Sequence, residues 1–174
     1  MRGAALGVVP LLLAGCAALS GAPAPAAATA SLQDAGGRTV GMATLIQVGD
    51  AVRILMEVRS LPPGPKAVHL HAVGRCQPPD FASAGGHFNP TGQEHGVLNP
   101  RGPHAGDLAS VTVGADGRGR LETTTEMVSL LSGPTSILDP DGSALVVHAR
   151  GDDFRTDPTG NSGDRIACGV IRRS

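Results

Sequence analysis

Six histidines are the residues of this chain best suited to chemistry, and their spacing sorts them into three groups. His69 and His71 form a pair, His87, His95 and His104 form a spaced group, and His148 stands alone near the end of the chain, while a carboxylate, Asp107, follows three residues after His104. Neutral imidazole is the commonest nitrogen ligand for zinc and copper. Six imidazoles and a carboxylate exceed the needs of one tetrahedral site, so the set predicts two adjacent metals with a shared ligand.

The expected secondary structure indicates which histidines can chelate together. On a strand, His69 and His71 point to the same face, and His148 ends another apolar run. With a shared His87 these three supply four nitrogens in a flattened site, which suits Cu(II). The spaced histidines together with Asp107 instead make a closed tetrahedral zinc site, which is typical of a structural metal.

The apolar pattern predicts an all-β fold. Residues 52–58 alternate apolar and polar side chains, which is the period of a strand with one buried face. Similar runs predict about eight short strands, at residues 31–35, 39–48, 52–58, 67–72, 108–113, 118–124, 144–149 and 166–171. Short strands separated by turn residues favour an antiparallel sandwich or barrel.

Two long segments interrupt this pattern, at residues 74–106 and 151–164. Both are rich in glycine and polar residues, and both flank the proposed ligands. Loops of this length in a compact domain are usually functional or disordered, so we expect functional loops here. Residues 126–139 fit a loop with a helical turn, and the sequence does not decide between the two.

The N-terminal residues have the features of an export signal. Arg2 precedes an apolar stretch, residues 4–14, that is too short to span a membrane. The sequence then reads LAGC, ending at Cys16, which resembles a bacterial lipoprotein signal. We therefore expect a signal peptide with a lipobox at residues 1–16, lipidation of Cys16, and a domain at residues 31–174.

Residues 17–30 are rich in alanine and proline and are expected to be a disordered tether. The alternative is an ordinary secretory signal cleaved near residues 28–30. Both interpretations predict export to the cell envelope, periplasm or cell surface, and the first also predicts a lipid anchor on a membrane.

The cysteines bear on the cellular compartment, and the charge bears on the kinds of partner. If Cys16 carries lipid, Cys76 and Cys168 remain, and an oxidising compartment would pair them; the alternative is two buried thiols. The formal net charge is −1 and the single lysine is Lys66. The chain therefore lacks the basic patch that a nucleic-acid partner requires.

From about residue 31 onward the chain resembles the bacterial copper–zinc superoxide dismutases. The matching segments are HLH at 69–71, GGHFNP at 85–90, HG at 95–96, HAGDL at 104–108, VH at 147–148 and GNxGxRxxCGVI at 160–171. A lone HxH would be a weak signal, whereas the combined spacing is specific. The resemblance implies an eight-stranded Greek-key barrel that converts superoxide to O2 and H2O2 with one copper and one zinc per subunit.

The resemblance also assigns ligands. It implies that the copper ligands are His69, His71, His87 and His148, and that the zinc ligands are His87, His95, His104 and Asp107. His87 would bridge the two metals and carry a proton during the copper redox cycle. The other histidines and Asp107 would hold the metals in place.

Three further roles follow from the same resemblance. Asp152 matches an aspartate that links a copper-ligand imidazole to a zinc-ligand imidazole, Arg165 matches an arginine that attracts the anionic substrate, and Cys76 with Cys168 matches a disulfide. Plainer readings are a loop-turn role for Asp152 and an ion pair with Asp164 for Arg165. The second loop has no lysine, so steering by a lysine cluster is not expected.

Two alternatives to a dismutase use the same residues differently. A non-catalytic, copper-binding envelope lipoprotein that buffers copper would keep the ligands without an open coordination position. A purely structural β-sandwich would fold without metal. The complete ligand set favours the enzyme, and a homodimer is one assembly that the resemblance allows.

Overall fold

The computed structural model describes residue 3 and residues 26–174. The predicted lipidation site, Cys16, and nearly all of the predicted signal peptide and tether lie outside the described residues. The described part contains ten strands and one 3-10 helix. These elements are β1 (Ala27–Gln33), β2 (Thr39–Val48), β3 (Ala51–Val58), β4 (Gly64–Lys66), β5 (Val68–His71), η1 (Ala82–Ala84), β6 (Val111–Val113), β7 (Gly119–Thr125), β8 (Ala144–His148), β9 (Arg165–Val170) and β10 (Arg172–Arg173).

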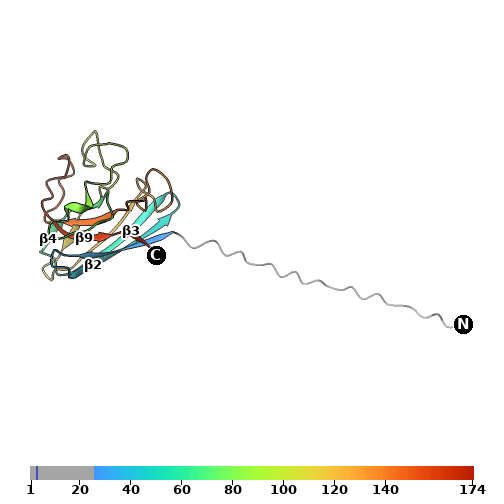
Figure 1. Ribbon diagram of the computed structural model, residues 1–174, viewed down its shortest axis with the longest axis horizontal. Coiled ribbons are helices and arrows are strands. Elements are labelled where there is room, and N and C mark those ends of the chain that lie inside the picture. The colour runs from blue at the N-terminus through green and yellow to red at the C-terminus, as the bar shows by residue number, and fades with distance from the viewer. Residues whose placement is uncertain (1–2, 4–25) are drawn as a thin grey trace.

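The strands form a curled antiparallel barrel (Figure 1). The main sheet has the order β5-β8-β9-β1-β2-β3-β7, with β10 paired to β1, and β4 and β6 form a separate pair. Strands β1, β2 and β3 are consecutive neighbours, and β9 returns through long connections to lie beside β1. This is a Greek-key arrangement, and it confirms the all-β fold expected from the alternation.

Period-two alternation produces the core. In β3 the apolar positions Val52, Ile54, Met56 and Val58 are all buried. The polar face of the same strand turns outward, where Arg53 bonds to Glu122 of β7. One face of the sheet therefore fills the barrel and the other meets solvent.

The N-terminal boundary differs from the prediction. Strand β1 starts at Ala27, so the predicted end of the tether at residue 30 and the predicted domain start at residue 31 are wrong. Ala28 and Ala30 are buried, and they pair with Leu45 and Ala43 of β2. Alanine has little intrinsic strand preference, and here pairing on both sides of β1 overrides it.

Other differences are local. Strand β4 was not predicted because it contains Gly64 and Pro65, which are poor strand formers, and β10 is only two residues long. Strand β6 begins at Val111 and not at residue 108. Residues 126–139 form turns without a helix, and the only helix among the described residues is η1, in the first long loop.

The two long loops lie side by side on the barrel (Figure 1). The Leu98 amide donates a hydrogen bond to the Phe154 carbonyl across 2.9 Å and joins them. Gly96 lies at this contact with φ of 101°, and a Cβ there would come within 2.2 Å of the Phe154 oxygen. Only glycine allows this approach of the loops.

A disulfide ties the first loop to the sheet. Cys76 and Cys168 are bonded, with their Cα atoms 5.6 Å apart, so the predicted pairing is confirmed. Cys168 is buried within β9. The bond therefore fixes the start of the first loop against the strand that carries Arg165.

Within residue 3 and residues 26–174, the structure has no helix long and apolar enough to cross a membrane.

The position of β1 generates a test. A chain that starts at Ser31 loses four β1 residues, including the buried Ala28 and Ala30, and should lose on the order of 3–5 kcal/mol of unfolding free energy. A chain that starts at Ala26 keeps β1 and should unfold at the same urea concentration as the full chain. Equal midpoints for the two truncated chains would contradict the strand boundary.

Candidate metal centre

Two paired strands hold three of the predicted ligands. Strand β5 carries His69 and His71, and its neighbour β8 ends at His148. Isolated bridges join His71 to His87 and His69 to Asp107, so the loop ligands lie directly against β5. The structure brings together all seven residues that the sequence predicted as ligands: His69, His71, His87, His95, His104, Asp107 and His148.

A first group consists of four imidazoles whose ligand atoms lie within 4.8 Å of one another: His69, His71, His87 and His148. Each presents one buried nitrogen that has no hydrogen-bond partner. These atoms are His69 Nδ1, His71 Nε2, His87 Nε2 and His148 Nε2. An unpaired buried polar atom is costly, and four that converge fit a metal ion as their common partner.

The opposite nitrogens of these rings are fixed by the protein. His71 Nδ1 donates to the Gly85 carbonyl across 2.9 Å, and His148 Nδ1 donates to the Gly163 carbonyl across 3.1 Å. His69 Nε2 donates to Asp152 Oδ2 across 2.7 Å. These bonds select the tautomer in which the unpaired nitrogen carries a free lone pair.

A second group gathers around one oxygen of Asp107. Asp107 Oδ1 lies 3.0 Å from His87 Nδ1, 2.9 Å from His95 Nδ1 and 3.5 Å from His104 Nδ1. The His87 and His104 Nδ1 atoms are 3.2 Å apart. Metal–ligand bonds near 2.0 Å give a tetrahedron with edges of about 3.3 Å, so these four atoms fit a zinc ion.

His69 lies close to both groups. Its ligand atom also falls within 4.8 Å of those of His87, His95 and Asp107. Its Nε2 is nevertheless bonded to Asp152, and its unpaired atom is Nδ1 in the first group. His104 Nδ1 lies 3.2 Å from His87 Nδ1, and His104 is therefore a better fourth member of the second group than His69.

His87 belongs to both groups through different atoms. Its Nε2 is one of the unpaired atoms of the first group, and its Nδ1 faces Asp107 in the second. This one imidazole thus offers one nitrogen to each group.

Asp152 connects the two groups by hydrogen bonds to one histidine of each. Its Oδ2 accepts from His69 Nε2 across 2.7 Å, and its Oδ1 accepts from His95 Nε2 across 2.9 Å. Gly160 packs against this bridge, and a Cβ at that position would lie 2.0 Å from Asp152 Oδ1. The geometry matches the linking position predicted for Asp152, whose side chain is buried. Its Oδ1 also accepts a hydrogen bond from the Phe154 amide across 2.7 Å, so Asp152 has the loop-turn role as well.

Burial keeps three histidines of the first group in their ligand form. It lowers the pKa of His69 to about 4, of His71 to about 2 and of His148 to about 3. These imidazoles are therefore neutral at neutral pH, with lone pairs available to a metal.

The second group attracts positive charge. Burial works to raise the pKa of Asp107 and Asp152, but hydrogen bonds from histidines outweigh it and hold both pKa values well below the usual range. Burial alone would lower the pKa of His95, yet its bonds to these two carboxylates raise it to about 9. Two buried anions stabilise a cation here, which is the charge that a divalent metal supplies.

Arg165 lies beside the first group. Its Nη1 donates to the Phe81 carbonyl and its Nη2 to the Gly85 carbonyl, each across 2.7 Å. Gly85 also accepts from His71, so one carbonyl orients both the guanidinium and a candidate ligand. Arg165 lines an open pocket together with His71, His87 and His148.

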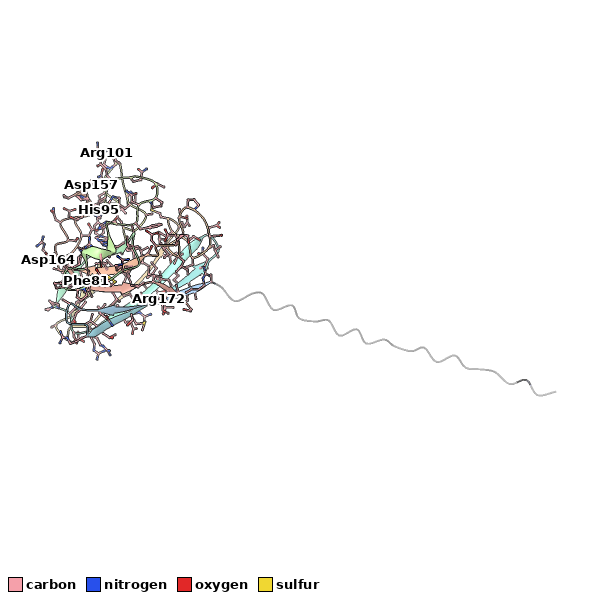
Figure 2. All side chains as sticks on the ribbon, viewed as in Figure 1. Phe81, His95, Arg101, Asp157, Asp164 and Arg172 are labelled. Carbon is pink, nitrogen blue, oxygen red and sulfur yellow. A yellow bond between two sulfur atoms is a disulfide. The ribbon has the colours of Figure 1, made fainter. Side chains whose placement is uncertain are left out.

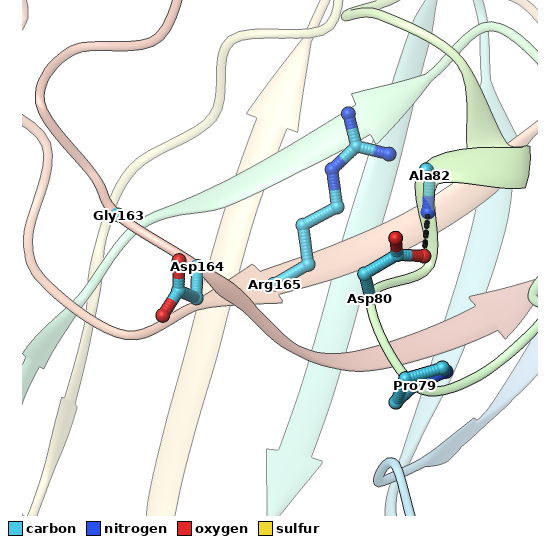
Figure 3. A pocket seen from close by; sticks show the side chains of 6 residues that line it. All are labelled: Pro79, Asp80, Ala82, Gly163, Asp164 and Arg165. Carbon is cyan, nitrogen blue, oxygen red and sulfur yellow. Dashed lines mark hydrogen bonds between the residues drawn. The ribbon is translucent and has the colours of Figure 1, made fainter.

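A second pocket, of about 490 Å³, is also lined by Arg165 and includes Asp80 and Asp164 (Figure 3). Figure 3 shows the Asp164 carboxylate apart from the Arg165 guanidinium, so the plainer reading of an Arg165–Asp164 ion pair is not supported. Both carboxylates nevertheless place negative charge near the arginine.

Sequence reasoning missed several groups that position the ligands. The carbonyls of Phe81, Gly85 and Gly163 carry no side-chain signal, because any residue has a carbonyl. Asp157, whose Oδ1 accepts from the His95 amide across 2.7 Å, was not among the predicted site residues.

Comparisons with known proteins agree with this geometry. The family model described as copper/zinc superoxide dismutase matches residues 39–171. The chain is 46% identical to the Cu-Zn superoxide dismutase 1 of Aquifex aeolicus over 138 residues, which cover 78% of this chain and 82% of the relative. It is 41% identical to the Cu-Zn superoxide dismutase of Caulobacter vibrioides over 148 residues, 83% of this chain and 85% of the relative.

A solved structure shows the same fold. The crystal structure of a SOD-like protein from Bacillus subtilis superposes with a TM-score of 0.77 at 41% identity. The match covers 82% of this chain and 96% of that one.

The fold and site define a β-barrel metalloenzyme with two adjoining histidine-rich metal positions. The chain belongs to the copper/zinc superoxide dismutase family. It is an oxidoreductase whose cofactors are copper and zinc.

Proposed function

We propose that the chain dismutates superoxide to O2 and H2O2 at a copper site that shares His87 with a structural zinc site. The copper ligands are His69, His71, His87 and His148, and the zinc ligands are His87, His95, His104 and Asp107. The observation that carries the proposal is the pair of orientations at His87: Nε2 is unpaired within the first group, and Nδ1 faces Asp107 in the second.

The two metals supply different chemistry. Bound copper supplies a centre that alternates between Cu(II) and Cu(I), whereas zinc has no redox chemistry and serves to fix geometry. His87 Nε2 is buried without a hydrogen-bond partner, so it is the atom that would hold a proton when it is not a ligand, and His87 lines the pocket that contains Arg165. Asp107 keeps the ring in place through Nδ1.

Arg165 is proposed to guide the anion. Burial lowers the pKa of its guanidinium, but an arginine remains charged at neutral pH. Two carbonyls fix the guanidinium at the rim of the pocket that contains His71, His87 and His148. The nearby Asp80 and Asp164 oppose long-range attraction, so guidance acts over a short distance.

The test of the function is the decay of superoxide measured by stopped flow. Full chain loaded with copper and zinc should accelerate decay toward the diffusion limit, whereas the zinc-only protein should not. Tight copper binding without faster decay would instead support the alternative, a non-catalytic copper-buffering protein.

The guiding role of Arg165 has its own prediction. Arg165→Ala should lower kcat/KM roughly tenfold and weaken its dependence on ionic strength, because a local positive charge is lost. Copper and zinc content, measured on the same samples, should stay at one of each per chain. Arg118→Ala removes an exposed arginine from a hairpin and serves as the control. An unchanged salt dependence for Arg165→Ala would contradict the role.

We also propose that the protein is exported to the cell envelope, held on a membrane by lipid at Cys16, and protects the envelope from superoxide. The LAGC sequence ending at Cys16 and the disulfide support this, because disulfides persist in oxidising compartments. Replacement Cys16→Ser should move the protein from the membrane fraction to the soluble fraction. A variant that stays in the membrane fraction would overturn the anchor.

A further inference from the structure

Asp157 lies where the two long loops meet. It belongs to the second loop, and its Oδ1 accepts a hydrogen bond from the backbone amide of His95, in the first loop, across 2.7 Å. The same oxygen lies 3.6 Å from His104 Nε2. Figure 2 shows Asp157 and His95 together on the loops above the barrel.

The two nitrogens of His104 face different partners. Nδ1 turns inward, 3.2 Å from His87 Nδ1 and 3.5 Å from Asp107 Oδ1. Nε2 turns outward toward Asp157. His104 thus has a ligand atom on one side of its ring and a carboxylate on the other.

His95 also has a ligand atom on one side of its ring and a carboxylate on the other, and there the carboxylate is hydrogen-bonded. Its Nδ1 lies 2.9 Å from Asp107 Oδ1, and its Nε2 bonds to Asp152 across 2.9 Å. A carboxylate behind a ligating imidazole fixes the ring orientation and makes the ligand more basic. Asp157 takes a similar place behind His104, but its carboxylate is exposed and its Oδ1 lies 3.6 Å from Nε2, which is an ion-pair distance and longer than a hydrogen bond.

We infer that Asp157 is a positioning residue for the zinc site, which orients His104 through Nε2 and fixes His95 through its amide, and thereby slows the loss of zinc. The inference rests on the proposed zinc ligands. The two contacts of one carboxylate oxygen place two candidate ligands under the control of a single loop residue.

Asp157 also couples the zinc site to the substrate pocket. The next two residues, Pro158 and Thr159, line the pocket that contains His71, His148 and Arg165. A carboxylate that anchors this segment to the zinc ligands therefore also sets the position of a pocket wall.

Two neighbouring residues give matched controls. Thr156 donates through Oγ1 to Asp153 and shapes the same loop without touching a candidate ligand. Asp164 carries the same charge in the same loop and has no contact with the second group. A purely structural effect of the loop would appear in Thr156→Ala, and a purely electrostatic effect would appear in Asp164→Asn.

The experiment measures zinc release from copper-free, full-length protein into a colorimetric chelator, with Co(II) absorption spectra recorded on samples loaded with cobalt in place of zinc. Asp157→Ala should release zinc about 10–100-fold faster and should change the Co(II) ligand-field bands. The rate of zinc release from Asp157→Asn should fall between the rates from Asp157→Ala and from the unmodified protein, because the side-chain amide oxygen can still accept a hydrogen bond from the His95 backbone amide. The rates of zinc release from Thr156→Ala and Asp164→Asn should stay within about twofold of the rate from the unmodified protein. This change is small beside the one expected when the carboxylate partner of a ligand is removed.

Three outcomes would overturn the inference: unchanged zinc release in Asp157→Ala, unchanged Co(II) bands in that variant, or equally fast release in Thr156→Ala. Asp107→Ala separates this failure from failure of the zinc assignment. If Asp107→Ala loses zinc while Asp157→Ala does not, only the role of Asp157 fails. If Asp107→Ala retains zinc as tightly as the unmodified protein, the proposed ligand set itself is wrong.

Discussion

The site depends on the burial of two carboxylates, Asp107 and Asp152, among histidines. Each carboxylate contacts at least two imidazoles, so each one holds several histidines in place at once. Buried anions of this kind are stable only where positive charge or several donors surround them. The requirement for a cation is therefore built into the protein.

The barrel fixes part of the site through paired strands. Paired strands β5 and β8 fix His69, His71 and His148, while the disulfide between Cys76 and Cys168 anchors the start of the first loop. Loop ligands such as His104 then need only local contacts to reach the rigid ones. A metal centre held partly by strands and partly by loops combines precise geometry with an open side for substrate.

The open side has mixed electrostatics. Arg165 presents a fixed positive charge beside the first group, but Asp80 and Asp164 lie close to it. A small anion approaching this face meets a local attraction and not a broad positive field. Under the proposed function the arrangement separates two tasks, since the interior carboxylates would support the metal ligands and the arginine at the rim would orient the substrate.

The sequence by itself determined the all-β class, most strand positions, the seven candidate ligands and the pair of cysteines. It could do so because strand alternation is local and because ligand chemistry depends on residue type. It failed at Ala27–Ala30, where pairing with β2 and not local propensity makes the strand. Only the tertiary structure decided which nitrogen of each histidine is free, that Asp157 reaches His95 and His104, and that the Gly85 carbonyl serves both His71 and Arg165. Those facts depend on contacts between residues far apart in the chain, and a ring orientation or a carbonyl direction leaves no trace in residue type.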